Sequence, residues 1–281
     1  MFQRLANSWE LVKASFRVLQ QDKELLVFPI LSTFGVVLVT LGFIFPFLIG
    51  NLFDTVFSGQ NQIAGFLVIA AYYVVQYAVI FFANTALVGA AMIRLEGGDP
   101  TVRDGLEIAA RNFASILGYA LIAATVGMIL RSASERSKGL GRFVVSLLGT
   151  AWNVATYLVV PVLAVEGIGP IESVKRSASL LKQTWGEQIA GNIGIGGLTV
   201  LVIIGILVMG GALGAGIAYL ELGIIPIIIV GVFTVMLLVI VGLVSSTLNS
   251  IYTAAVYQYA TTGKSGQFFD PQLVENAFRR K

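Results

Sequence analysis

GIIPIIIVGVFTVMLLVIVGLVSSTLNSIYTAAVYQY, residues 223–259, contains no Asp, Glu, Lys, Arg or His. A helix crosses the hydrocarbon core of a bilayer, about 30 Å thick, with roughly 20 residues. This segment is therefore long enough to span a membrane. Lipid offers no hydrogen bonds to backbone groups, so the segment must satisfy its own as a helix.

Five more segments are equally free of charged residues, at 25–50, 62–93, 113–130, 143–165 and 188–219. The chain of 281 residues is 57% hydrophobic and 12% charged, which is too apolar for an ordinary soluble domain. No alternating pattern of the kind found in barrel strands is present. The sequence therefore predicts an all-α, polytopic membrane protein with six transmembrane helices.

The distribution of Lys and Arg indicates the topology. With six spans, 14 basic residues fall on the side of both termini: Arg4, Lys13, Arg17, Lys23, Arg94, Arg103, Arg111, Lys175, Arg176, Lys182, Lys264, Arg279, Arg280 and Lys281. The opposite side has four, all in the third loop: Arg131, Arg136, Lys138 and Arg142. Because cytoplasmic loops are enriched in Lys and Arg, we expect a plasma (inner) membrane protein with cytoplasmic termini. Either the third loop lines an outer headgroup surface, or the third and fourth segments do not both span fully.

A weak internal repeat organises the chain. Glu96-Gly97, followed by Pro100, recurs 70 residues later as Glu166-Gly167, followed by Pro170. We predict a unit of one interfacial helix and two spans, occurring three times in a single membrane domain, 1–260, with units at about 1–93, 94–165 and 166–260. The remaining residues, 261–281, form a cytoplasmic tail, where Asp270-Pro271 predicts the start of a short amphipathic helix.

Each predicted unit begins with an amphipathic stretch that is flanked by basic residues. Such a pattern is typical of helices that lie in the headgroup plane of a membrane. The predicted basic surface consists of Lys13, Arg17, Arg103, Arg111, Lys175, Arg176 and Lys182. The predicted interfacial anchors are Trp9, Phe16, Phe113 and Trp185.

The composition removes much site chemistry. The chain has no Cys and no His, so it lacks disulfides, thiolate metal sites and Ser-His-Asp triads. Glu96 and Glu166 are the repeated carboxylates, and we expect them to cap helix starts rather than to bind metal. We predict no catalytic residue, no metal and no cofactor.

Three Asn residues occupy comparable places in the second, fourth and sixth spans: Asn84, Asn153 and Asn249. Asn84 lies 12 residues before Glu96, which at 1.5 Å per residue places it about 18 Å from the helix end, near mid-bilayer. The three could form a polar cluster that holds a neutral solute, water or a lipid headgroup. Alternatively, they hydrogen-bond neighbouring helices together, at about 0.6 kcal/mol each.

Small residues in the fifth span predict close helix packing. Gly210 and Gly214 are four residues apart, and Gly211 precedes Ala215 by the same interval. This small-xxx-small pattern lets helix backbones approach within the protein or against a second copy.

Three parts of the sequence resemble those of a known protein family. They are the N-terminal run Ser8-Trp9-Glu10-Leu11-Val12-Lys13, the run Asp22-Lys23-Glu24-Leu25-Leu26 and the tail Phe269-Asp270-Pro271. With them, nearly the whole chain resembles an uncharacterised family of prokaryotic six-span membrane proteins, a domain of unknown function. The resemblance implies fold and membrane location, and no activity. The region from Pro161 to Trp185 also resembles the membrane domain attached to some glycerophosphodiester phosphodiesterases. That likeness transfers no catalytic residue, since the hydrolase of those proteins is a separate soluble domain.

These observations predict a non-enzymatic membrane protein that engages lipid, through anionic headgroups, or a protein partner through its basic interfacial helices. The partner could also be a second copy of the chain. The alternative is a small facilitator or channel for a neutral solute, lined by the three Asn residues. Nucleic acid is not expected, because a basic balance in a membrane protein reflects topology.

Overall fold

The computed structural model describes residues 2–50, 62–185, 195–264, 267–270 and 274. Apart from turns and loops, this part of the chain is entirely helical. Its elements are α1 (Phe2–Gln21), the short 3-10 helix η1 (Lys23–Leu26), α2 (Val27–Gly50), α4 (Gln62–Leu95), α5 (Val102–Arg111), α6 (Phe113–Arg136), α7 (Leu140–Ala155), α8 (Val159–Val165), α9 (Pro170–Trp185), α10 (Ile195–Tyr219) and α11 (Ile224–Thr262).

Within the described residues, six stretches are long and apolar enough to cross a membrane: Lys23–Leu48, Ile63–Leu95, Phe113–Arg136, Leu140–Val165, Thr199–Tyr219 and Ile224–Thr262. Each contains most or all of one segment predicted from the sequence. The predicted fold class, an all-α polytopic membrane protein, is therefore confirmed. The first residues of the predicted span 188–219 and nearly all of the predicted tail helix lie outside the described residues.

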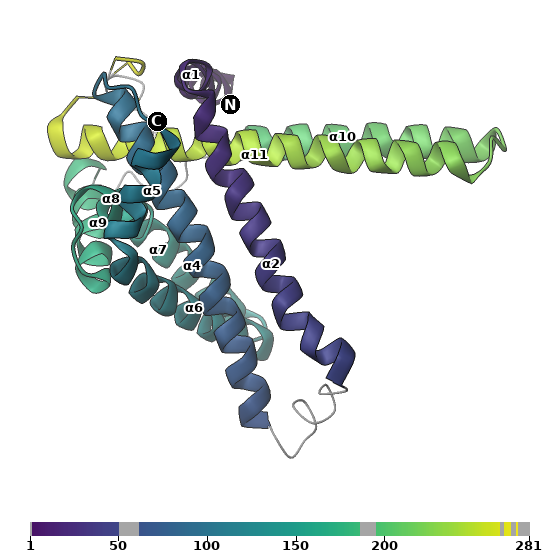
Figure 1. Cartoon of the computed structure of the whole chain (residues 1–281), viewed down its shortest axis with the longest axis horizontal. Helices are drawn as coiled ribbons and strands as arrows, with labels where there is room; N and C mark the ends of the chain where they lie inside the picture. Colours follow the sequence, from purple (N-terminus) through teal and green to yellow (C-terminus); the bar gives the residue numbers. More distant parts are fainter. Residues whose placement is uncertain (1, 51–61, 186–194, 265–266, 271–273, 275–281) are drawn as a thin grey trace.

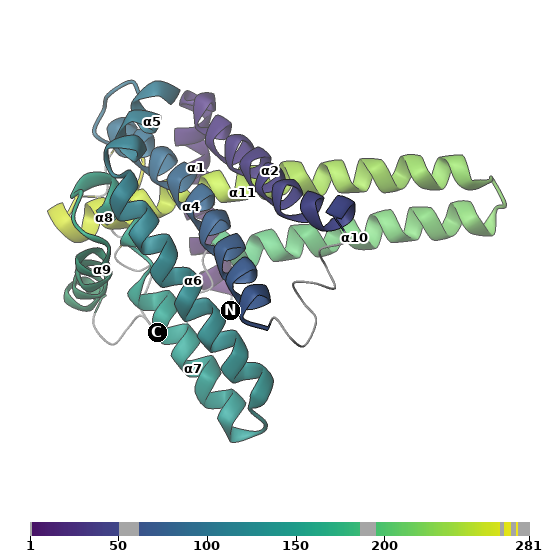
Figure 2. The same ribbon diagram turned by 60° about the horizontal axis from the view of Figure 1, so that its bottom comes forward.

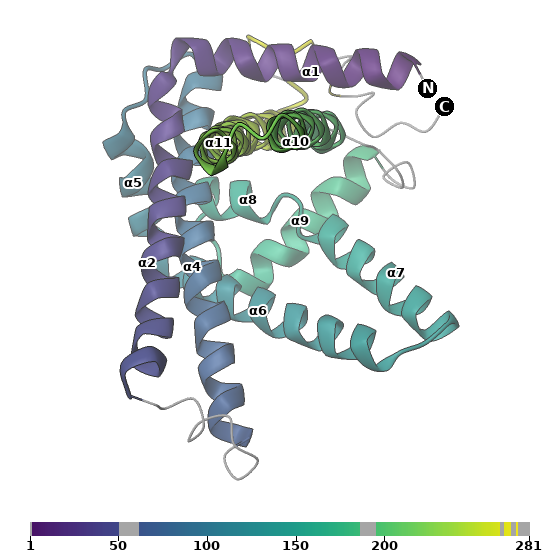
Figure 3. The same ribbon diagram turned by 90° about the vertical axis from the view of Figure 1, so that its right-hand side faces the viewer.

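The long helices form three antiparallel pairs that leave a common base in different directions (Figures 1 and 2). The pairs are α2 with α4, α6 with α7, and α10 with α11. When the molecule is viewed along α10 and α11, the other two pairs are seen lengthwise (Figure 3). We call these pairs the arms. The base, which we call the hub, consists of α1, η1, α5, α8, α9 and the adjoining ends of α4 and α11.

Burial separates hub from arm within single helices. The end of α4 that includes Leu87 and Ala91 is buried, as is the stretch of α11 around Ile251 and Val256. By contrast, ten large apolar side chains between Ile224 and Ile240 of α11 are about half exposed or more. Exposing such a side chain to water costs about 1 kcal/mol or more, so ten would rival a net folding free energy of about 5–15 kcal/mol. The arms therefore require lipid around them.

The predicted span 143–165 is a single apolar segment but not a single helix. α7 ends at Ala155 and α8 begins at Val159. Pro161 explains the break, because proline has no N–H to donate to the carbonyl four residues earlier and its ring disrupts a continuing helix. The Leu158 amide instead donates to Ser177 Oγ of α9 at 3.0 Å, in a buried position.

α5 begins with a capping box and then approaches α4 closely. Thr101 Oγ1 accepts from the Asp104 amide at 3.3 Å, and the Thr101 amide donates to Asp104 Oδ2 at 2.9 Å. The Thr101 hydroxyl also donates to Asp104 and lowers the pKa of that carboxyl. One turn into the helix, a Cβ on Gly105 would lie 2.5 Å from Phe28 Cζ and 2.6 Å from the Ala86 carbonyl oxygen. Only glycine therefore lets α5 rest on α2 and α4 in this way.

Replacing Gly105 by alanine should destabilise the protein by about 1–3 kcal/mol, because the new methyl group overlaps a backbone oxygen that cannot move freely. Gly42→Ala is the matched control, since a Cβ at Gly42 meets no described atom within 4 Å and alanine favours the helix. Thermal unfolding in detergent, followed by far-UV circular dichroism, measures both. Equal midpoints for the two variants would show that α5 does not pack as described.

Candidate functional site: the hub surface and the groove beneath α5

α1 presents two different faces. Leu11, Ala14 and Val18 are buried against the hub. The opposite side carries Trp9 and Phe16, which are 50% and 44% exposed. This division produces an amphipathic helix with aromatic side chains left uncovered, which is typical of a helix at a membrane interface.

Basic residues lie beside these aromatic side chains. The Lys13 ammonium bonds to Glu10 at 2.8 Å and sits 5.7 Å from the centre of the Trp9 ring. Arg17, one turn further along, is exposed and has no carboxylate partner in the described part of the chain. We call Trp9, Lys13, Phe16 and Arg17 the α1 stripe.

The predicted basic residues of α5 and α9 are also at the surface. Arg103 and Arg111 are exposed and both bond to Glu107, at 2.8 and 3.4 Å. On α9, the exposed Lys175 and Lys182 form no ion pair with any described residue. Of the seven predicted basic residues, five are on α5 and α9 and two are on α1. Arg176 of α9 is partly exposed and bonds to Glu166, as described below. Of the predicted anchors, Phe113 is 50% exposed, and the side chain of Trp185 lies outside the described residues.

Arg94 connects three parts of the hub. Its guanidinium, at the end of α4, donates to both carboxylate oxygens of Asp22 and also bonds to Asp99. The Arg94 and Asp22 side chains are only 16% and 6% exposed. The pair therefore ties the end of α1 to the end of α4. Arg94 appeared in the sequence only as a topology signal, and nothing in the local pattern indicated Asp22 as its partner.

Glu166 forms a second polar junction, between α8, α9 and α11. Its carboxylate accepts from Arg176 Nε at 2.9 Å and from the Tyr257 hydroxyl at 3.0 Å. It follows the last turn of α8 rather than starting a helix, so the expected capping role is wrong. Glu96 likewise follows α4, and Thr101 with Asp104 caps α5 instead. The acidic side chains of the described chain nowhere gather in a group of three that could hold a metal ion.

The three Asn residues lie near the places where arms meet the hub. Asn84 is partly buried at the start of the buried part of α4. Asn153 is exposed in the last turn of α7, and Asn249 is exposed on α11. No hydrogen bond between described residues joins their side chains, so a shared polar cluster stays a prediction.

A polar contact does join α2 and α4, through residues that the sequence analysis did not single out. The buried Gln76 amide nitrogen donates to Thr40 Oγ1 and to the Tyr72 hydroxyl, each at 2.8 Å. An isolated Gln in the apolar segment 62–93 was the available signal. Such bonds hold membrane helices together.

Some glycines of α10 lie at a helix contact and others face open space. A Cβ on Gly210 would overlap Thr234 Oγ1 of α11, so glycine permits the close approach of these two helices. Gly211 and Gly214 have no described atom within 4 Å of that position. Their packing role stays a prediction.

The basic third loop lies at the end of the α6–α7 arm, away from the hub (Figure 3). Arg131 donates from Nη1 to the Tyr73 hydroxyl and from Nε to Glu135, both at 3.0 Å. Arg136, Lys138 and Arg142 follow at or near the turn. The fold therefore separates this basic cluster from the basic residues of the hub.

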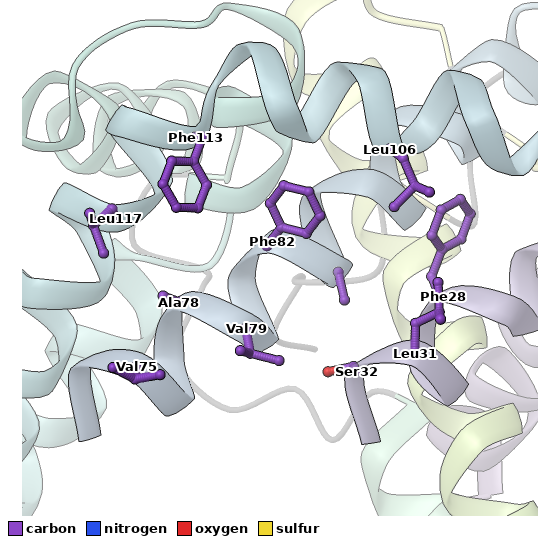
Figure 4. Close-up of a pocket in the computed structure, with 11 residues that line it drawn as sticks. Phe28, Leu31, Ser32, Val75, Ala78, Val79, Phe82, Leu106, Phe113 and Leu117 are labelled. Atoms are coloured by element: carbon purple, nitrogen blue, oxygen red, sulfur yellow. The ribbon is translucent and has the colours of Figure 1, made fainter. Parts of the chain in front are cut away.

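An apolar groove of about 460 Å³ lies beneath α5, between α2, α4 and the start of α6 (Figure 4). Leu106 and Phe113 descend into it from above, while Val79 and Phe82 line it from α4 (Figure 4). Ser32 supplies the single polar side chain among its eleven lining residues. The groove is thus covered by α5 of the hub and walled by helices of two arms, α2 and α4 of one and α6 of the other.

The arms and the hub together define a multi-pass helical membrane protein with a compact helical base. Within that class, residues 63–268 match the model of a family of unknown function, DUF6159, and the chain belongs to this family. No curated protein and no solved structure matches the chain. The resemblance to an uncharacterised membrane family is thereby supported, and the likeness of Pro161–Trp185 to a phosphodiesterase membrane domain stays a prediction.

Arg94→Gln should destabilise the protein by about 3 kcal/mol, because it leaves the buried Asp22 carboxylate without its partner. Lys13→Gln is the control, since it breaks an exposed pair whose contribution is below about 1 kcal/mol. Chemical unfolding of both variants in mixed micelles compares the two losses. A loss for Arg94→Gln no larger than the control would contradict the role of this pair in joining α1 to α4.

Proposed function

We propose that this protein is a non-enzymatic component of the plasma membrane that binds anionic lipid headgroups through the basic faces of its hub helices. The α1 stripe is the observation that carries this proposal. Two half-exposed aromatic rings and two basic side chains alternate along one uncovered side of the helix. Aromatic rings favour the membrane–water interface, and Lys and Arg are attracted to anionic lipid there.

Unpaired charge supports the same proposal. Arg17, Lys175 and Lys182 are exposed and have no carboxylate partner among the described residues. An exposed cation without a local partner keeps its full attraction for an external anion. Near an anionic membrane surface each such residue contributes about 1 kcal/mol.

The proposed orientation puts the hub and both termini on the cytoplasmic side. The hub carries most of the Lys and Arg, and the cytoplasmic leaflet presents the negative surface potential that would attract them. A protein partner or a second copy that bears an acidic surface would meet the same residues. Lipid is the proposed ligand because the stripe pairs its charges with aromatic side chains.

The test is the lipid retained by purified protein after exchange into an equimolar mixture of phosphatidylglycerol and phosphatidylcholine, counted by native mass spectrometry. Replacing Arg17, Lys175 and Lys182 together by Gln should lower the preference for phosphatidylglycerol about fivefold or more for each residue that faces the headgroups. Glu10→Gln should raise the preference, since it releases Lys13 from its ion pair.

The matched control keeps the charge at the same positions, with Arg17→Lys, Lys175→Arg and Lys182→Arg, and should retain the wild-type preference. If the Gln variant also retains it, headgroup binding by these residues is ruled out. Retention by neither triple variant would mean that packing rather than charge is involved, which contradicts the proposal equally.

A further inference from the structure

The wall that α4 contributes to the groove beneath α5 belongs to a stretch that is long and apolar enough to span a membrane. This wall runs from Val75 to Ala83, which at 1.5 Å per residue is about 12 Å of helix. Val75 and Leu117 are themselves exposed, so the groove adjoins the surface that lipid covers. In the proposed orientation, molecules that reach the groove therefore come from the bilayer.

The lining determines what kind of molecule fits. Apart from Ser32, every lining side chain is a hydrocarbon or an aromatic ring, which gives a polar solute nothing to replace its lost hydrogen bonds. A groove of about 460 Å³ is within the range of small-ligand sites, roughly 300–1,000 Å³. The groove is thus an almost purely apolar space of small-ligand size, which suits a flexible hydrocarbon chain.

We propose that this groove binds one acyl chain of a bilayer phospholipid, held between α2 and α4 and covered by Leu106 of α5. Phe28 and Phe82 provide the walls nearest the hub (Figure 4). An acyl chain bound there would fill the space that the packed helices leave between them. The proposal rests on the proposed engagement of lipid and adds a tail-binding site to it.

The charges on α5, which covers the groove, favour recognition of the lipid acyl chain over recognition of a headgroup. On α5, Arg103 and Arg111 are balanced by Asp104 and Glu107, and both arginines already bond to Glu107. Glu24, from η1, additionally accepts from the Val102 amide at 3.3 Å. The site is therefore expected to hold lipids with anionic and with zwitterionic headgroups alike.

Filling the groove tests this inference. In Ala78→Phe the new ring occupies the space that the chain would take, and Ser32→Phe fills it from the opposite wall. Ala71→Phe is the matched control, because Ala71 lies on the same helix, is exposed and does not line the groove. The measurement is the number of phosphatidylcholine molecules retained per protein, counted by native mass spectrometry after exchange into phosphatidylcholine alone.

Wild type and Ala71→Phe should retain one tightly held phospholipid, and both filling variants should retain it at least tenfold less. Equal retention in all four proteins, or none in the wild type, would overturn the acyl-chain site. Two filling variants on different helices guard against a folding defect in one, and gel filtration of each reports on folding. The two proposals fail separately: groove variants change the number of lipids, and the hub charge variants change only the ratio of headgroups.

Discussion

The long helices of this protein lie in two environments, lipid around the arms and packed protein in the hub. The outer part of α11, from Ile224 to Ile240, leaves large apolar side chains uncovered, whereas the part around Ile251 is buried by protein. Water around the first part would cost roughly as much free energy as a domain gains by folding. Lipid is therefore part of the folded state. Protein contacts between arms are made where α4 packs along α6, for example between the rings of Phe81 and Tyr119.

The hub follows from the same constraint. Where the helices leave lipid, their polar groups need partners, and the hub supplies them through a few specific contacts. Arg94 binds Asp22 across two helices, and Glu166 binds Arg176 and Tyr257 across three elements. Ser177 accepts the Leu158 amide that the break before Pro161 leaves free. These contacts hold the ends of the arms together, and they leave the exposed basic residues Arg17 of α1 and Lys175 and Lys182 of α9 available.

The class of fold could be predicted from composition and segment length, because the hydrocarbon core imposes both on every span. From sequence, Pro161 is compatible with either a kink or a helix start. The break before it could not be located, since the acceptor of the freed Leu158 amide, Ser177 Oγ, belongs to a different helix. The polar contact of Gln76 with Thr40 and the partner of Arg94 depend on how distant segments pack. Local patterns in a single sequence do not reveal which distant residues meet. The sequence places the three Asn residues only by their distance along each helix. In the structure they lie near the positions where the helices pass from the exposed arms into the buried hub.

The groove illustrates the same limit. Phe28, Phe82 and Leu106 belong to three helices, and each has an ordinary apolar pattern of its own. Their shared space exists because Gly105 lets α5 rest directly on α2 and α4. A single glycine in a short amphipathic helix gives no sign of this in the sequence.

The proposed topology, with the hub at one membrane face and the arm tips at the other, is tested most directly by single-cysteine labelling. The chain has no Cys, so each introduced thiol is the sole reporter. Gln20→Cys marks the hub, and Ser137→Cys and Glu221→Cys mark the tips of the α6–α7 and α10–α11 arms. A membrane-impermeant maleimide added to intact cells should label both tip positions and leave the hub position unlabelled. If Ser137→Cys or Glu221→Cys instead shares the side of Gln20→Cys, that arm does not cross the membrane and the account is contradicted.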